Sequence, residues 1–102
     1  MGVDVYLESE SGEQLEELAD PSGLVALLLP DWQDKTSAFL RFIDLYGGTV
    51  FNCLQMDTFV SELEAAVEKA SEKKVIAHGR AILKLARKCK DEVHTYLKFY
   101  GD

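Results

Sequence analysis

The chain of 102 residues predicts one domain with a core of its own. Its net charge of −7 argues against nucleic acid as a partner of the whole surface, because phosphates would be repelled. The start, Met1 to Asp4, has no basic leader, and the longest apolar run, 24–29, is too short to cross a bilayer. We therefore expect a cytoplasmic protein with no membrane partner.

Charge is divided unevenly along the sequence. Residues 1–68 contain 14 acidic and two basic residues, a net charge of −12, whereas residues 69–102 contain nine basic and four acidic residues, a net charge of +5. Folding must bring these two blocks together. The division also indicates recognition through charge, and a basic protein is the partner that fits an acidic surface.

The first elements are predicted from alternation and turn residues. Apolar residues at odd positions predict a half-buried strand over 3–8, followed by a turn over 9–13. Residues 14–18 fit either a short strand or a simple link.

A short helix is expected next. Asp20 is a favoured N-cap, Pro21 is tolerated at the first helical position, and the apolar block 24–29 fills about two turns, buried on most sides. Pro30 ends this helix, and a polar loop follows over 31–37.

The middle of the chain predicts a β-hairpin. Residues 38–44 are rich in Phe, Leu and Ile and are typical of a strand, 45–48 contain the glycine pair of a turn, and 49–52 return as the partner strand. The polar residues around this turn either bond to backbone, which we expect of Asp44 and Asn52, or recognise a partner.

Two amphipathic helices follow. Asp57 is the expected cap of a helix over 58–70, and Ser71 of a second helix over 72–91. The apolar faces are Phe59, Leu63, Ala66, Val67 and Ala70 on the first, and Val75, Gly79, Ile82, Ala86 and Cys89 on the second. A glycine inside a helix costs about 1 kcal/mol against alanine, so Gly79 indicates close approach of a neighbouring element.

Residues 93–100 alternate again and predict a terminal strand. The elements together predict an α+β fold. In it, a small mixed or antiparallel sheet of N-terminal strand, central hairpin and C-terminal strand packs against two long amphipathic helices and one short helix, in one domain over 1–102.

One candidate surface is the even-numbered side of the two terminal strands. If both strands lie in one sheet, that face gathers Tyr6, His94, Tyr96, Lys98 and Tyr100. Tyrosines are typical of binding surfaces because they offer area and a polar tip at low entropic cost. The alternative is that this face is merely the partly wet back of the sheet.

A second candidate is the acidic N-terminal segment, which either docks a basic partner or is a solvated loop. Its residues are Glu8, Glu10, Glu13, Glu16, Glu17 and Asp20. For binding a protein partner we select Glu13, Glu16, Glu17, Arg41, Tyr46, Tyr96 and Tyr100.

A third candidate is the basic face of the second long helix. It predicts either a weak anion site, formed by Arg80, Lys84, Arg87 and Lys88, or a solvated face that pairs with nearby acids. No aromatic residue is interleaved with these bases, which argues against stacking of single-stranded nucleic acid.

Catalytic and metal-binding motifs are not found in the sequence. Cys53 and Cys89 fit two buried thiols better than a disulfide, and neither His78 nor His94 is spaced to couple to a cysteine or serine. We expect no enzymatic activity, no metal and no cofactor.

Two segments are distinctive: LRFIDLYGGTVFNCLQM over 40–56 and HTYLKFYGD over 94–102. They resemble a family of small bacterial proteins of no established activity, with an LRFID-x-YG-x-TVFN-x-LQ motif. The resemblance runs over most of the chain and implies a bacterial, cytoplasmic protein, but it supplies no catalytic residue. Gly48 stands where the family has an acid, so any role of that acid does not carry over.

Three functions remain open. The first is a non-enzymatic protein-interaction module, most concretely an immunity or antitoxin-like inhibitor that occludes a basic partner; a homodimer is also compatible with it. The second is a small ligand-binding or regulatory domain whose pocket, between sheet and helices, is lined by Trp32, Tyr46, His78 and His94. The third is a nucleic-acid-associated protein that uses the basic helix.

Overall fold

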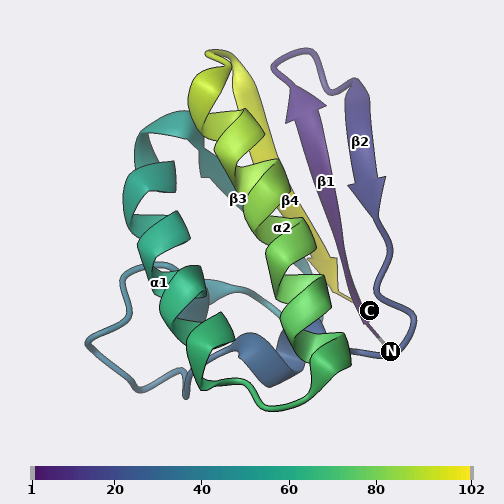
Figure 1. The fold of residues 1–102 in the computed structure, drawn as a ribbon. Coiled ribbons are helices and arrows are strands. Elements are labelled where there is room, and N and C mark those ends of the chain that lie inside the picture. The colour runs from purple at the N-terminus through teal and green to yellow at the C-terminus, as the bar shows by residue number, and fades with distance from the viewer. Residues whose placement is uncertain (1, 102) are drawn as a thin grey trace.

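The computed structural model describes residues 2–101 and has the predicted α+β architecture. One antiparallel sheet contains β1 (Val3–Ser9), β2 (Gln14–Leu18), β3 (Gly48–Asn52) and β4 (Thr95–Gly101), in the order β2-β1-β4-β3. Two helices, α1 (Met56–Lys69) and α2 (Lys73–Asp91), lie side by side across one face of this sheet (Figure 1). Within residues 2–101, neither helix is long and apolar enough to cross a membrane.

The two terminal strands are neighbours at the centre of the sheet. Val5 lies opposite Phe99 and Leu7 opposite Leu97, and all four side chains are buried beneath the helices. The alternation that predicted both strands is therefore confirmed. Residues 14–18, left open between strand and link, form the edge strand β2.

The predicted hairpin is wrong in its first strand. Residues 38–44 contain only a 3₁₀ turn, Leu40–Phe42, and β3 pairs with β4 instead. Glu62 on α1 holds this segment, because its carboxylate accepts hydrogen bonds from Ser37 Oγ, from the Ala38 N–H and from the Phe39 N–H. The apolar residues of 38–44 thus contact the core from a loop, which their composition could not distinguish from a strand.

The short N-terminal helix is also smaller than predicted. Only one 3₁₀ turn forms, Val25–Leu28, and Leu27 is 62% exposed, so the segment is not buried on most sides. Asp20 lies four residues before Leu24, and its carboxylate accepts hydrogen bonds from the N–H groups of Leu24 and Val25. The N-cap position of this turn is Leu24, so Asp20 is not its N-cap and Pro21 is not its first residue, contrary to the prediction. The Asp20 carboxylate instead bonds to the backbone where the turn begins.

The start of α1 was misplaced by two residues. Asn52 and Gln55 form a capping box around the 3₁₀ turn Cys53–Gln55, which continues directly into α1. Asp57 therefore lies in the first turn of α1 and is not its cap. In α2 the N-cap position is Glu72, without a side-chain hydrogen bond, so Ser71 does not cap this helix.

The predicted apolar stripes meet in one continuous core. On α1, Phe59 and Leu63 are buried, and every residue of the predicted stripe on α2 is buried. A Cβ atom on Gly79 would lie 2.5 Å from Val67 Cγ2 and 3.3 Å from Leu28 Cδ1. The glycine therefore permits α1 and the Val25–Leu28 turn to approach α2 closely, as its position in the stripe indicated.

Candidate functional site

The helices α1 and α2 cover one face of the sheet, and the second face lies opposite them (Figure 1). The alternating burial of β1 and β4 places their tyrosines on this second face. Because side chains alternate along a strand, the residues paired across β1 and β4 at even positions share this face. The cross-strand pairs are Asp4 with Tyr100, Tyr6 with Lys98, and Glu8 with Tyr96. We call this surface the open sheet face; Val50 on β3, 54% exposed, lies beside Lys98 on it.

Tyr6 is at the centre of a polar and aromatic contact on this face. Its hydroxyl donates to Glu17 Oε2 at 3.1 Å, and its ring packs edge to face with Tyr100, with centroids 5.3 Å apart. Desolvation raises the pKa of the Tyr6 hydroxyl, and the bond to Glu17 and the charges of Glu17 and Asp4 raise it further. Tyr6 therefore lies in a region of negative potential.

Glu8 and Lys98 form the ion pair in the middle of the open sheet face. Lys98 Nζ lies 2.8 Å from Glu8 Oε1, and the Glu8 side chain is only 4% exposed. The hydrogen bond to Glu8 raises the pKa of Lys98. A buried carboxylate is strongly destabilising without a cation beside it, so the pair stabilises the sheet. Because the two charges cancel, this part of the face is neutral.

The structure brings some of the predicted partner-binding residues together and separates others. Glu17, Tyr96 and Tyr100 share the open sheet face. Glu16 points to the opposite side, where its carboxylate lies 2.5 Å from Lys88 Nζ on α2. Glu13 lies in the turn before β2 and is exposed.

The two partner-binding residues predicted around the hairpin lie in loops outside the sheet. Arg41 donates from Nε to the Ser37 carbonyl at 2.9 Å and from Nη1 to the Trp32 carbonyl at 3.2 Å, so two of its donors close its own loop. Tyr46 is 76% exposed in the loop before β3. The backbone role predicted for Asp44 is confirmed, because its carboxylate accepts from the Tyr46 N–H.

His94 was predicted on the tyrosine face but lies before β4. It has a φ of 72°, which places it in the turn after α2, and its Nδ1 contacts Glu10 Oε2 at 2.9 Å. Sequence reasoning placed Tyr6 on the candidate tyrosine face, but it selected neither Tyr6 nor Asp4 among the partner-binding residues. The alternation of β1 places both residues on one face of that strand. Bringing them next to Tyr100 requires the register between β1 and β4, which are far apart in the sequence and show no local signal for it.

The basic helix face is partly neutralised. Arg87 Nη2 lies 2.8 Å from Glu64 Oε2, and Lys88 pairs with Glu16. Arg80 and Lys84 are exposed on α2 and have no ion-pair partner among residues 2–101. The four residues of the predicted anion site therefore do not present four free charges.

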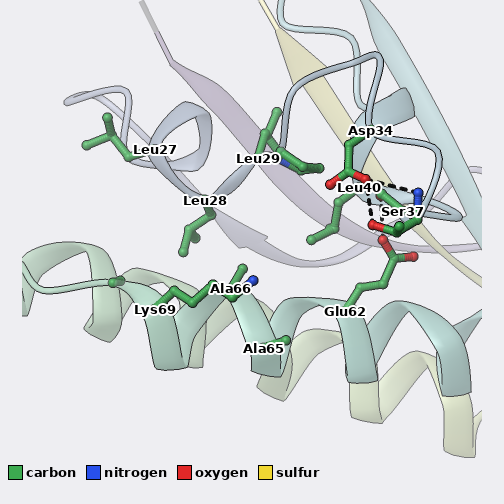
Figure 2. Close-up of a pocket in the computed structure, with 13 residues that line it drawn as sticks. Leu27, Leu28, Leu29, Asp34, Ser37, Leu40, Glu62, Ala65, Ala66 and Lys69 are labelled. Carbon is green, nitrogen blue, oxygen red and sulfur yellow. Dashed lines mark hydrogen bonds between the residues drawn. The ribbon is translucent and has the colours of Figure 1, made fainter.

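A groove lies between α1 and the loop over 27–40, which is a different place from the pocket predicted between sheet and helices. It encloses about 410 Å³, with Leu27, Leu28 and Leu29 on one side and Ala65, Ala66 and Lys69 of α1 on the other (Figure 2). Glu62 closes one end by reaching toward Ser37. None of Trp32, Tyr46, His78 and His94, the predicted lining, borders this groove.

His78 is the histidine nearest a buried carboxylate. Its Nε2 lies 3.9 Å from Asp20 Oδ1 and has no hydrogen-bond partner among residues 2–101. Burial raises the pKa of Asp20, but the bonds from the Val25, Val3 and Leu24 N–H groups, with the His78 charge, lower it by more. Backbone donors therefore hold Asp20 as an anion, and its carboxylate serves to fix the backbone around it.

The two cysteines are free thiols, Cys53 partly buried and Cys89 buried. Burial raises the pKa of the Cys89 thiol. No group of three or more potential ligands capable of holding a metal ion occurs within residues 2–101.

Comparisons of the chain with protein families, with characterised proteins and with solved structures find no match.

Proposed function

We propose that this protein is a non-enzymatic interaction module that binds a basic protein partner through the open sheet face. The observation that supports it best is the grouping of Tyr6, Tyr96 and Tyr100 with acidic side chains on the sheet face opposite α1 and α2. Tyrosine rings supply contact area at low entropic cost, and the carboxylates select a basic surface and speed its approach.

The most concrete form of this proposal is an inhibitor of the immunity or antitoxin type. Such a protein would lay its tyrosines and carboxylates into a basic cleft of the partner and exclude that partner's substrate. A bacterial, cytoplasmic setting is part of the same proposal, supported by the resemblance of the segments 40–56 and 94–102 and by the free thiols.

Site-specific photocrosslinking tests the proposal. A photoreactive phenylalanine analogue at Tyr100 is expected to capture one protein in the source cell, and the same analogue at Lys84 on α2 is expected to capture none. With that protein purified, Glu17→Gln should weaken binding about tenfold, since a charged interface contact contributes on the order of 1.4 kcal/mol.

Glu16→Gln is the matched control, because Glu16 is the neighbour of Glu17 on the other side of β2. It should leave the affinity unchanged. If Tyr100 yields no protein at low or moderate salt, or if Lys84 yields the same protein, the open sheet face is not the binding surface.

A small-ligand function is the second candidate, because the groove of about 410 Å³ beside α1 falls within the range of ligand pockets. Leucines and alanines line most of it, and Asp34, Glu62 and Lys69 lie among them. Two of those polar groups already have partners, since Glu62 accepts from Ser37 and Asp34 from Thr36. A nucleic-acid role for α2 has less support, because Arg87 and Lys88 are paired with carboxylates.

A further inference from the structure

The unpaired negative charge of the open sheet face lies on the side of Tyr6 that is away from Lys98, toward β2 and the start of β1. We call this part of the face the Tyr6 end. Lys98 neutralises Glu8, whereas Asp4 and Glu17 have no ion-pair partner among residues 2–101. Both carboxylates flank Tyr6, because Asp4 precedes it by two residues on β1 and Glu17 lies opposite it on β2. A cation that approaches this face is therefore attracted to the Tyr6 end and not to the middle.

Each of these two carboxylates is fixed through one oxygen. Glu17 Oε2 accepts the Tyr6 hydroxyl at 3.1 Å, and Asp4 Oδ1 accepts the Asp20 N–H at 2.8 Å. No donor within the described part of the chain, 2–101, bonds to Glu17 Oε1 or Asp4 Oδ2. Two oriented acceptors thus remain open to donors from a partner.

The tyrosine rings beside them add a second attraction for a cation. Tyr100 is 41% exposed and is packed edge to face against Tyr6, which holds both rings in place. A cation over an aromatic ring is attracted by the ring's quadrupole. A guanidinium fits better than an ammonium, because it is planar, stacks on the ring and can donate to two carboxylates at once.

We infer that the basic partner of the proposed function, on which this step rests, presents an arginine side chain to the Tyr6 end of the open sheet face. Its guanidinium stacks on the exposed ring of Tyr100. Its N–H groups donate to the open oxygens of Glu17 and Asp4. Charge complementarity selects a cation for this position, and the exposed ring selects a planar one.

The inference is tested with N-acetyl-arginine methylamide as the probe, titrated into the isotopically labelled full chain and followed by amide chemical shifts. We expect saturable shifts confined to residues 4–6, 16–18 and 98–100, with a dissociation constant that is roughly millimolar. The lysine analogue should bind about threefold more weakly, and the uncharged citrulline analogue should give no saturable shift.

Two variants and one control locate the probe. Glu17→Gln and Tyr100→Leu should each weaken arginine binding by about threefold or more, since one removes a carboxylate and the other the ring. Glu16→Gln should bind the probe like the unmodified chain. Equal shifts from arginine and citrulline, shifts centred elsewhere, or a Glu17→Gln variant that binds normally would each overturn the inference.

The partner experiment separates this inference from the proposed function. A protein that is captured through Tyr100 but binds the Glu17→Gln variant and the unmodified chain equally overturns the arginine contact and leaves the interaction module standing. Failure to capture any protein through Tyr100 overturns the proposed function, and with it the assignment of the arginine to a protein partner.

Discussion

Asp20 is the residue on which three segments of the chain converge. Its buried carboxylate accepts hydrogen bonds from the Val3 N–H at the start of β1 and from the Leu24 and Val25 N–H groups at the start of the 3₁₀ turn. Because the side chain is completely buried, removing its charge leaves backbone donors without a full partner. One side chain therefore joins the N-terminal strand to the turn that packs against α2.

Asp20→Asn should lower the free energy of unfolding by about 2 kcal/mol at neutral pH, because an amide oxygen replaces a carboxylate that binds three donors. The native pKa of Asp20 lies below its ordinary value. Its contribution is therefore complete above the unfolded pKa of about 3.9 and is lost as pH falls through the lower native pKa. Urea unfolding from about pH 7 to about pH 2 should show the two proteins converging at the acidic end.

Asp31→Asn provides the comparison for this prediction. Asp31 also accepts a backbone N–H, from Gln33, but in an exposed loop. The Asp31→Asn substitution should change the free energy of unfolding by no more than about 0.5 kcal/mol. Equal stability of Asp20→Asn and the unmodified chain at neutral pH would show that the converging bonds contribute nothing net.

Gly79 decides how closely the two helices approach. Replacing it with alanine gains about 1 kcal/mol of helix propensity, but the new Cβ would lie 2.5 Å from Val67 Cγ2. Overpacking of this kind costs about 1–3 kcal/mol, and the β-branched Val67 cannot rotate away easily. Gly79→Ala should therefore destabilise the protein by about 1 kcal/mol in chemical unfolding.

The same substitution should change sign when Val67 is shortened. In a Val67→Ala background, the 2.5 Å contact is removed and the nearest remaining atom is Leu28 Cδ1, at 3.3 Å on a flexible side chain. Gly79→Ala should then stabilise the protein by up to about 1 kcal/mol. Greater stability of Gly79→Ala in both backgrounds would mean that the helices are not in close contact at this point.

Local patterns were sufficient for α1, α2 and the terminal strands, because the periodicity of each element is visible within its own segment. They failed for the hairpin, since the partner of β3 is β4, more than 40 residues later along the chain. The apolar residues of 38–44 contact the core because a hydrogen bond to Glu62, a residue of α1, holds their backbone in place. Their composition alone fits both a strand and a packed loop.

The candidate site was predictable to a similar degree. Alternation placed Tyr6 on one side of its strand and Tyr96 and Tyr100 on one side of theirs. The three tyrosines lie on one face only because β1 pairs with β4. The contact of Glu17 with Tyr6, and the opposite direction of Glu16, depend on the register of β2, which no local pattern specifies.

At the scale of the molecule, folding joins the acidic and basic blocks of the sequence. Each ion pair between a carboxylate and a lysine or arginine within residues 2–101 connects residues 1–68 to residues 69–102. These pairs are Glu8–Lys98, Glu16–Lys88, Asp57–Lys90 and Glu64–Arg87. Three of them are well exposed, and exposed pairs contribute only about 0–1 kcal/mol each, so the blocks are held together mainly by the shared core.

Salt should therefore affect stability and partner binding differently. Between about 50 and 500 mM NaCl the free energy of unfolding should change by less than about 1 kcal/mol, because salt weakens the exposed pairs and also the self-repulsion of a chain with net charge −7. Association with a basic partner should slow about tenfold or more over the same range, since the uncompensated charge of Asp4 and Glu17 acts at long range.

Urea unfolding and stopped-flow association at both salt concentrations measure the two effects on the same protein. Loss of most of the stability at high salt would mean that the ion pairs, and not the core, hold the acidic and basic blocks together. An association rate that is independent of salt would mean that the partner is recognised without its charge. The open sheet face would then act through its tyrosines alone, and the preference for a basic partner would have no physical basis.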